Sequence, residues 1–345
     1  MKVNFQIYHY GRGKCVRKGE KMGVRYRRIF WTLLLLINMA VVSVVGYLHV
    51  SGKDFSVSQK ENSHLIGLSY MTMNNEFYKI MSEEINARIE AEGDRMVMRD
   101  PALDVERQIT QIEEMLTMGI DVLVLTPVDS EKIVDVLRKA KKQGVYIVVL
   151  DTGVSDQTVA DCTITSDNYG AGVAVGEYFL SKKQQARVVV MTHQAAQSGR
   201  NRVQGFLDTV AGSEDIKIVK SIECEGQTEI AMPGMRSVIE TGTDFDTVFC
   251  LNDLATVGVI AALEEKGMLD KVGVYGVDGS PDAKALIHEG MMQATAAQFP
   301  SEIGKTAAEN IYRLLEGEPV EKMTRIPVRL VDKENVDSFG TDRWQ

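Results

Sequence analysis

The sequence predicts an α/β protein with two doubly wound parallel-sheet lobes, preceded by one transmembrane helix. Three observations lead to this fold class: short apolar runs recur along the chain, segments of helical periodicity separate them, and one long uncharged stretch lies near the N-terminus. Unbroken apolar runs of four to six residues are typical of parallel strands buried on both faces. The expected strands are residues 65–70, 95–99, 122–126, 146–150, 188–192, 216–222, 247–251, 272–277 and 294–299.

Helices are expected between these runs because apolar residues repeat there every three or four positions. One such apolar stripe contains Phe77, Met81, Ile85 and Ile89. Strand–helix–strand units repeated in this way predict parallel sheets with right-handed crossovers. Residues 160–169 interrupt the alternation, and we interpret them as a passage between lobes. Several helices are expected to end at a glycine before the next strand: Gly93, Gly119, Gly144 and Gly267.

The first 50 residues are expected to anchor the chain in the cytoplasmic membrane. Residues 29–50 contain no Lys, Arg, Asp or Glu, and these 22 residues are enough for a helix to span a bilayer. Nine Lys or Arg and one acidic residue, Glu20, lie within residues 1–30, so the basic segment 1–28 should stay cytoplasmic. Residues 51–63 would form a tether, and residues 51–345 of this single-pass protein would be extracytoplasmic.

A cleavable signal peptide is the alternative for this stretch. Its apolar part would be shorter, about 7–15 residues, and a small-x-small cleavage site would follow it. No such site follows residue 50, so an uncleaved anchor is favoured. Met22 opens a conventional short basic head, which makes it an alternative start of the protein.

The composition excludes several classes of function. A chain of 345 residues can hold two ordinary domains, and 44% hydrophobic with 25% charged residues is typical of globular proteins. With a net charge of −9 and a basic N-terminal segment, the remaining chain is acidic, which argues against nucleic acid as its partner. No GxSxG, HExxH or CxxC motif occurs. We therefore expect no cofactor and no metal, and a binding protein rather than an enzyme.

Polar side chains follow many of the expected strands, at the edge where open parallel sheets bind ligands. Carboxylates and amides suit a polyhydroxylated ligand, and the nearby rings of Phe77 and Tyr78 suit the apolar face of a sugar. Asp253 and Asp129 are interpreted as N-caps of the following helices. His193 also ends a strand, and we assign it a structural or solvent-facing role. The polar residues at strand ends include Asn74, Asn75, Thr126, Asp151, Thr152, Asn252, Asp278 and Gln298.

Eight segments of the body form an ordered set of motifs. They are SYMTMNNEFY (69–78), LTPVDS (125–130), VLDT (149–152), TSDN (165–168), GRNRVQGF (199–206), VFCLND (248–253), VYGVDGSPD (274–282) and ATAAQFPSEIG (294–304). From about residue 64 to about residue 331 the chain resembles the ribose-type periplasmic sugar-binding proteins, which are type I periplasmic binding proteins with a LacI-like ligand-binding fold. The resemblance covers essentially the whole body.

The resemblance implies which residues bind the ligand. Two positions depart from the ribose pattern. Thr152, which we include in the site, stands where that pattern has an Arg, and Gly226 stands where it has an aromatic residue. The loss of a cation and of a stacking face changes the pocket, so a ligand larger than ribose could fill the space. The implied binding residues are Asn75, Phe77, Tyr78, Asp151, Arg202 (with Arg200 a less favoured substitute), Asn252, Asp278 and Gln298.

The resemblance also implies three lobe crossings, near Ser166, Gln298 and Pro327, which would make a three-strand hinge. The N-terminal lobe would contain residues 64–166 and 299–326, and the C-terminal lobe with its tail would contain residues 167–298 and 327–345. We expect this hinge to close around a pentose or hexose and so to stabilise the closed state.

Two partners are considered for the closed form: the permease of an ABC sugar importer and a sensor histidine kinase. An alternative ligand is a non-sugar signal, either a furanosyl autoinducer or a polyol, that feeds a sensor kinase. A transcriptional repressor with the same ligand-binding fold would carry an N-terminal helix-turn-helix. This chain has an apolar stretch there, which argues against a repressor.

Overall fold

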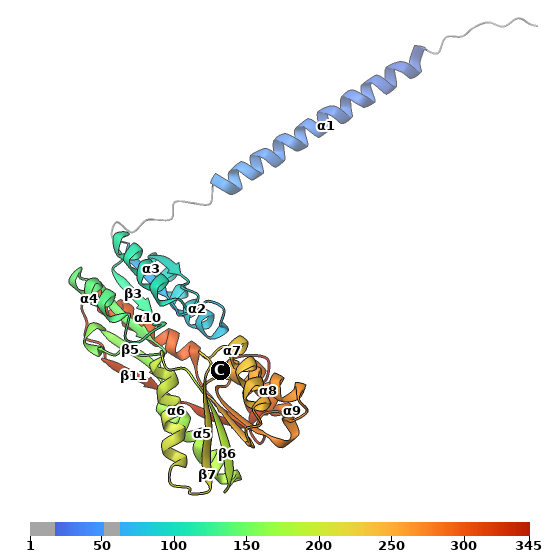
Figure 1. The fold of residues 1–345 in the computed structure, drawn as a ribbon. Helices are drawn as coiled ribbons and strands as arrows, with labels where there is room; N and C mark the ends of the chain where they lie inside the picture. Colours follow the sequence, from blue (N-terminus) through green and yellow to red (C-terminus); the bar gives the residue numbers. More distant parts are fainter. Residues whose placement is uncertain (1–17, 52–62) are drawn as a thin grey trace, which may run out of the picture. The chain divides into compact units, whose positions relative to one another are not determined.

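The computed structural model describes residues 18–51 and 63–345, and the chain falls into two compact units, Met1–Gln59 and Lys60–Gln345. Helix α1 (Lys18–Ser51) is the described element of the first unit (Figure 1). Within the described residues, no helix is both long enough and apolar enough to cross a membrane. This finding does not confirm the predicted anchor 29–50. Its last side chains, from residue 45 on, lie outside the described set, as do residues 1–17 and 52–62 of the predicted basic segment and tether.

The body begins with a lobe built on a six-stranded sheet in the order β11-β5-β4-β3-β1-β2. All five pairings in this sheet are parallel. Its strands are β1 (Leu65–Ser69), β2 (Arg95–Arg99), β3 (Val122–Leu125), β4 (Tyr146–Leu150), β5 (Cys162–Ser166) and β11 (Met323–Ile326). Its helices are α2 (Glu76–Glu92), α3 (Val105–Thr117), α4 (Val134–Lys142), the short η1 (Gln157–Val159) and α10 (Pro300–Leu315).

The second lobe is built on another six-stranded sheet, in the order β12-β10-β9-β8-β6-β7. Its pairings are parallel except for that of β10 with β12, which is antiparallel. Its strands are β6 (Ala186–Thr192), β7 (Ile216–Glu223), β8 (Thr247–Cys250), β9 (Gly273–Asp278), β10 (Ala294–Ala297) and β12 (Arg329–Asp332). Its helices are α5 (Asn168–Lys182), α6 (Gln197–Val210), α7 (Thr228–Glu240), α8 (Asp253–Glu265), η2 (Leu269–Lys271), α9 (Pro281–Glu289) and α11 (Val336–Phe339).

The prediction of two α/β lobes with parallel sheets is confirmed, and each of the nine expected runs contains a strand. The interpretation of residues 160–169 as a passage alone is wrong, because Cys162–Ser166 forms β5 in the first sheet. In its sequence CTITS, hydroxyl side chains alternate with apolar ones, so β5 contains no unbroken apolar run. The sequence prediction also missed β11 and β12, which are partly exposed edge strands of four residues each.

The first sheet is buried on both faces, as the apolar runs predict. In β3, Val122 and Val124 pack under α2 and α10, whereas Leu123 and Leu125 pack under α3 and α4. The predicted stripe of α2 is confirmed, since all four of its side chains are buried against this core. Each fully buried Val, Leu or Ile contributes about 1.5–3 kcal/mol of transfer free energy. These contacts fix the sheet edge at which the polar residues lie.

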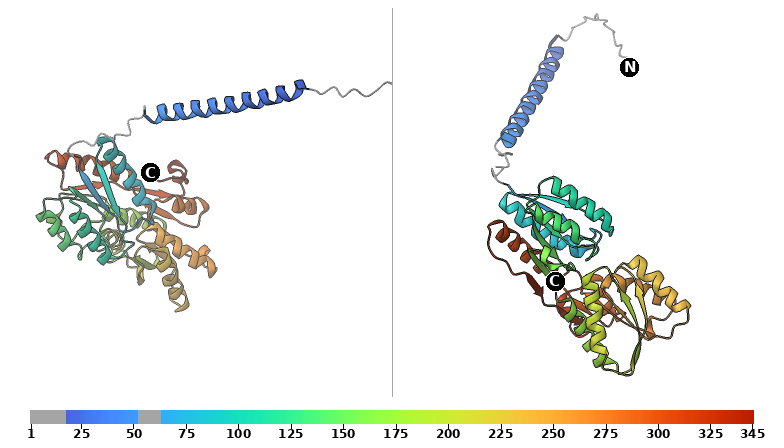
Figure 2. Two further views of the ribbon diagram at one scale, coloured as in Figure 1. Left: turned by 90° about the horizontal axis from the view of Figure 1, so that it is seen from above. Right: turned by 60° about the vertical axis from the view of Figure 1, so that its left-hand side comes forward.

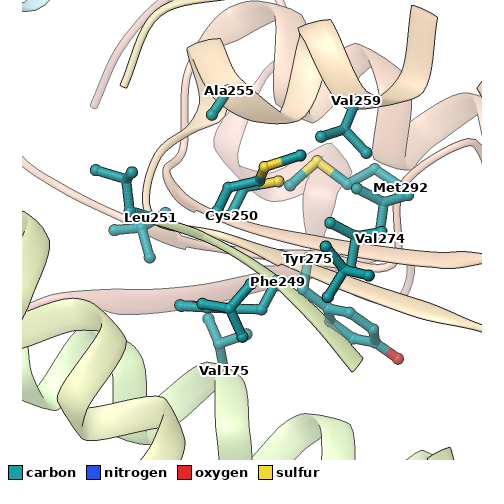
Figure 3. Close-up of a cluster of buried hydrophobic side chains, with 14 of the residues drawn as sticks. Val175, Phe249, Cys250, Leu251, Ala255, Val259, Val274, Tyr275 and Met292 are labelled. Carbon is teal, nitrogen blue, oxygen red and sulfur yellow. The ribbon is translucent and has the colours of Figure 1, made fainter. Parts of the chain in front are cut away.

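A single larger core holds the second lobe together (Figure 3). The rings of Phe206 on α6 and Phe249 on β8 stack with their centroids 4.2 Å apart. Cys250 follows Phe249 in β8 and is buried on the other side of this strand, near Val259 and Met292, and its thiol is free. The small residues of α5 let α6 approach closely: a Cβ atom on Gly172 would lie 2.0 Å from the carbonyl oxygen of Arg202. This close approach sets the position of α6 against the sheet.

Three segments pass between the lobes. The first joins β5 to α5, the second joins β10 to α10, and the third joins β11 to β12 through Pro327 and Val328. Two further views show the C-terminus lying where the lobes meet (Figure 2). There Trp344 contacts the ring of Phe77 in the first lobe, at a centroid distance of 5.5 Å.

Candidate functional site

A cavity of about 50 Å³ lies between the lobes, at the carboxyl ends of strands from both sheets. Eight of the nine predicted binding residues line it, and Thr152 is the exception. A volume of this size has room for a few water molecules. The residues around it are Met71, Thr72, Asn75, Phe77, Tyr78, Asp151, His193, Ala196, Ser198, Arg202, Glu225, Gln227, Leu251, Asn252, Asp278 and Gln298.

Asp151 is the first carboxylate of the cavity and follows β4 directly. Its backbone has a φ of 63°, which is uncommon for a residue other than glycine and turns the chain sharply at the strand end. The hydroxyl of Tyr78 donates to Oδ2 of this carboxylate at 3.2 Å. Burial raises the pKa of the Asp151 carboxyl to about 6, the nearby charge of Asp278 adds to this rise, and Arg202 opposes it.

Arg202 reaches the cavity from α6 in the second lobe and is 4% exposed. Its Nη1 donates to Oδ1 of Asp278 at 3.0 Å and to the carbonyl oxygen of Leu251 at 3.1 Å. Its Nε donates to Oδ1 of Asn168 at 2.7 Å. The carboxylate of Asp151 in the other lobe lies farther away, 3.9 Å from Nη2. The guanidinium is thus held mainly by its own lobe.

Asp278 is the second buried carboxylate and ends β9, with a φ of 139°. Besides the contact with Arg202, its Oδ1 accepts a hydrogen bond from Nε2 of Gln298 at 2.6 Å. The backbone N–H of Asp253 points at Oδ2 from 3.4 Å. Burial raises the pKa of the Asp278 carboxyl, and the charge of Arg202 limits that rise.

Asp253 is not the N-cap of α8, so that prediction is wrong. The cap is Asn252, whose Oδ1 accepts from the backbone N–H of Ala255 at 3.0 Å. The carboxylate of Asp253 is buried and accepts from the hydroxyl of Thr295 at 2.9 Å and from the backbone N–H of Ser280 at 2.8 Å. It therefore braces the loop after β9. Burial, with the charge of Asp278, raises the pKa of the Asp253 carboxyl well above its ordinary value. The prediction for Asp129 is also wrong, because the N-cap of α4 is Ile133; Oδ1 of Asp129 accepts instead from the backbone N–H groups two and three residues later, in the turn before that helix.

The two predicted asparagines, Asn75 and Asn252, line the cavity and also make hydrogen bonds that hold the local backbone in place. Oδ1 of Asn75 caps α2 by accepting from the backbone N–H of Phe77 at 3.0 Å. Nδ2 of Asn252 donates to the carbonyl oxygen of Gly226 at 2.9 Å. Gly226 has a φ of 65°, and a Cβ atom on it would lie 2.8 Å from that same Nδ2. An aromatic side chain at this position would displace Asn252, which is a physical reason for glycine here.

The predicted aromatic residues lie on the first-lobe side of the cavity. Phe77 and Tyr78 are both nearly buried and belong to the core under α2. The ring of Tyr78 stacks on Tyr70 at 5.8 Å, and that of Phe77 meets Trp344 edge to face at 5.5 Å. Each ring therefore packs in the core or against the tail with part of its surface and lines the cavity with the rest.

Thr152 joins the lobes instead of lining the cavity. Its Oγ1 accepts from the backbone N–H of Ser198 in the second lobe at 2.9 Å. A second pair of bonds lies beside it: the N–H of Ser130 donates to Ala195, and the hydroxyl oxygen of Ser130 accepts from the N–H of Gln197, both at 3.1 Å. The described arrangement is thus one in which the lobes touch.

The sequence prediction missed several residues of the cavity wall. Thr72, Ser198 and Gln227 line it with polar atoms, and so does Glu225 at its exposed rim. His193 also lines it and is 8% exposed, so of its two predicted roles, structural or solvent-facing, the solvent-facing one is wrong; burial lowers the pKa of its imidazole. Most of these residues follow β1, β6 and β7, so the rule of looking just after each strand would have found them.

The comparisons with known proteins all find similarity to solute binding proteins. The family model described as the periplasmic binding protein domain matches residues 66–319. The ribose import binding protein of Bacillus subtilis (strain 168) is 27% identical over 277 residues, which cover 80% of this chain and 89% of that protein. The ribose import binding protein of Escherichia coli (strain K12) is 26% identical over 271 residues, covering 78% and 90%.

Solved structures of solute binding proteins share the fold. The ABC transporter solute binding protein of Mycobacterium smegmatis with bound glycerol has a TM-score of 0.75 at 28% identity, covering 81% of this chain and 97% of that one. The solute binding protein of Bacillus halodurans C-125 with bound myo-inositol has a TM-score of 0.76 at 23% identity, covering 81% and 98%. At the latter identity the likeness concerns the fold alone.

Proposed function

Because the chain belongs to the periplasmic binding protein family, we propose that its two lobes capture a small sugar or cyclic polyol in the cavity between them. One observation carries the proposal: eight residues from the two lobes line a single cavity at the carboxyl ends of both sheets with carboxylate, amide, guanidinium and aromatic groups. Carboxylates and amides can satisfy several hydroxyl groups at once, while the rings cover apolar faces. Relatives named for ribose import, and a likeness to a structure with bound glycerol, support a polyhydroxylated ligand.

The proposed mechanism is closure of the hinge formed by the three crossing segments. A ligand that touches Asp151 in the first lobe and Arg202 or Asp278 in the second is bound fully only when the lobes meet. It therefore stabilises the closed state by its additional contacts there. The bonds of Thr152 and Ser130 across the interface stabilise the same state. No bond of the ligand is made or broken in this mechanism.

An ABC importer is the partner that the relatives favour, since they are named as import binding proteins. No observation favours a sensor histidine kinase. The two outputs can be separated in cells that naturally make this chain, by measuring uptake of labelled ligand after the chain is removed. Loss of uptake supports the importer. Normal uptake with an altered transcriptional response to the ligand would point to the sensor.

We propose that the body lies outside the cytoplasm, as is typical of its family, and that residues 29–50 attach it to the membrane. The support is the uncharged sequence of this stretch, together with the exposed apolar side chains of α1, such as Leu33, Leu35 and Ile37. Membranes from cells making the full chain should retain it after washing with alkaline carbonate. Release of the chain into the wash would overturn this attachment.

The ligand is tested by thermal unfolding of the full chain in detergent against pentoses, hexoses, inositols and furanosyl compounds. A ligand at about 100 times its dissociation constant adds roughly 2.7 kcal/mol, which raises the midpoint by several degrees. Asp278→Asn should weaken binding at least tenfold, because a charge-assisted hydrogen bond contributes about 1.5–3 kcal/mol. The matched control is Asp270→Asn, at an exposed position outside the cavity wall. The absence of a shift with any compound would overturn the proposed function.

A further inference from the structure

The cavity carries more negative than positive charge. Among the described residues that line it are three carboxylates, Asp151, Asp278 and Glu225, and one guanidinium, Arg202. The imidazole of His193 is neutral at pH 7 because burial lowers its pKa. When the carboxylates are ionised, two negative charges remain without a cation. Glu225 lies at the exposed rim, where solvent screens its charge, but Asp151 and Asp278 are both buried with one guanidinium between them. The second buried charge is costly unless another partner of opposite sign is present.

The buried cation Lys284 of the second lobe does not correct this excess. Lys284 is buried, but its Nζ donates to the carbonyl oxygen of Arg343 at 2.5 Å and to Oε1 of Gln345 at 2.8 Å. It is thus committed to the C-terminal tail. Behind Asp278, the carboxylate of Asp253 adds a further buried acid, which is satisfied by Ser280 and Thr295. The excess of negative charge therefore stays in the cavity.

A second observation concerns hydrogen bonding. Gln298 is 2% exposed and lines the cavity, and its Oε1 has no hydrogen-bond partner among the residues that the structure describes. Its Nε2 is already used by Asp278. A buried acceptor left without a donor costs about 1–3 kcal/mol. This oxygen therefore needs a donor from whatever fills the cavity.

Arg202 cannot supply both missing interactions. Its Nη1 is shared between Asp278 and Leu251, and its Nε is bonded to Asn168, so these two nitrogens are directed into the second lobe. Its remaining approach to Asp151, at 3.9 Å, is beyond hydrogen-bonding distance. Two of the three guanidinium nitrogens are thus already used by the second lobe, while the cavity presents charged and neutral acceptors to a ligand.

We propose that the natural ligand is an amine-bearing sugar or polyol, whose ammonium group binds between the acceptors of Asp151 and Gln298. This inference rests on the proposed function and narrows its ligand class. An ammonium group brings one positive charge and donors only, which complements both the excess carboxylates and the unpaired oxygen. A hydroxyl group at the same place would donate one hydrogen bond and leave the charge uncompensated. The remaining hydroxyls of the ligand would bind Asp278, Asn252 and Asn75.

The test uses matched pairs that differ by one hydroxyl and one amine. Calorimetric titration of the full chain in detergent at pH 7.5 would compare D-glucose with D-glucosamine, D-galactose with D-galactosamine, and sorbitol with glucamine. N-acetylglucosamine serves as the uncharged comparison for D-glucosamine, because acetylation converts the amine into a neutral amide. We expect at least one amine to bind ten times more tightly than its hydroxyl partner, and acetylation to remove the gain.

Variants separate charge from shape. Asp151→Asn keeps the size of the side chain and removes its charge, so the ratio of amine to hydroxyl affinity should fall at least tenfold. Glu225→Gln should lower the ratio less, since Glu225 is exposed at the rim and its charge is screened by solvent. Glu229→Gln is the matched control, because Glu229 is exposed on α7 and does not line the cavity. It should leave the ratio unchanged.

Each outcome decides a different point. If the hydroxyl compound binds more tightly in every pair, the amine inference is overturned while the proposed sugar site stands. If an amine is preferred but the preference survives Asp151→Asn, the assigned position of the ammonium group is wrong. If no compound of either kind binds to the folded chain, the proposed function fails and the inference fails with it.

Discussion

Replacing Arg202 by Met tests the charge arrangement of the cavity in the ligand-free protein. The substitution keeps most of the apolar stem and removes the guanidinium, which is 4% exposed and bonded to Asp278 and Asn168. Removing one partner of a buried ion pair costs about 3–5 kcal/mol, because the other charge stays buried and unpaired. For a body of this size each kcal/mol lowers the unfolding midpoint by roughly 2–4 °C. We therefore expect Arg202→Met to lower the midpoint by about 10 °C at pH 7.5.

The loss of stability caused by Arg202→Met should depend on pH, and the direction of this dependence follows from the two buried carboxyl groups. Arg202 opposes the rise of the pKa values of Asp151 and Asp278, so its loss raises both further above their unfolded values. A carboxyl group whose folded pKa is raised stabilises the protein below its unfolded pKa, and this stability is lost as the pH rises through the folded pKa. The destabilisation by Arg202→Met should therefore be smaller at pH 5 than at pH 7.5, where both carboxylates must stay charged.

The assay is thermal unfolding followed by near-ultraviolet circular dichroism, at both pH values and without ligand. Arg138→Met is the matched control, because Arg138 also contacts two acids, Asp135 at 2.9 Å and Asp156 at 2.6 Å, but is 51% exposed. Exposed pairs contribute at most about 1 kcal/mol. Equal shifts for the two variants, or a shift for Arg202→Met that does not change with pH, would refute the reasoning.

Three further predictions use the same unfolding and titration assays. Since burial raises the pKa of Asp151 from 3.8 to about 6, wild-type stability should fall by up to about 3 kcal/mol between pH 4 and pH 7, and Asp151→Asn should remove most of this fall. Thr152→Val removes the acceptor for the N–H of Ser198, so ligand affinity should drop several-fold in calorimetry; an unchanged affinity would exclude this bond from closure. Gly172→Ala places a methyl group 2.0 Å from a backbone oxygen of α6, which should lower the free energy of unfolding by about 3 kcal/mol or more. The control Gly212→Ala, at a position with open space around it, should not destabilise the protein. Similar unfolding midpoints for the two variants would contradict the close approach of the helices.

The fold could be predicted wherever a strand is buried on both faces. In β3 every side chain is fully buried, so its sequence VLVL is an unbroken apolar run. β5 was missed because Thr163 and Thr165 alternate with its apolar residues, although both threonines are buried. β11 and β12 lie at sheet edges, where exposed side chains such as Arg325 and Arg329 remove the apolar pattern. Burial by distant elements is the information that a local pattern lacks.

The site could be predicted in part for a related reason. Strand ends in one sheet converge by topology, so Asp151, Asp278 and Gln298 could be placed near a ligand from their positions after strands, and the resemblance added Arg202. The role of Thr152 could not be predicted, because its partner Ser198 lies in the other lobe, 46 residues away. The surplus of charge also depends on Lys284 being committed to the C-terminal tail, which only the folded arrangement reveals.

The two carboxylates that define the cavity are each held against a local cost. Asp151 and Asp278 have positive φ angles of 63° and 139°, and unusual backbone conformations of this kind cost about 1–3 kcal/mol each. Burial raises the pKa of both carboxyls, which adds an electrostatic cost when they are ionised. The buried cores beneath β4 and β9 supply the stability that keeps both residues in place. A cationic ligand would relieve the electrostatic part of this cost, whereas a neutral ligand would not. The pH dependence of stability that Asp151 imposes on the free protein should therefore vanish when an amine is bound and persist with a neutral sugar.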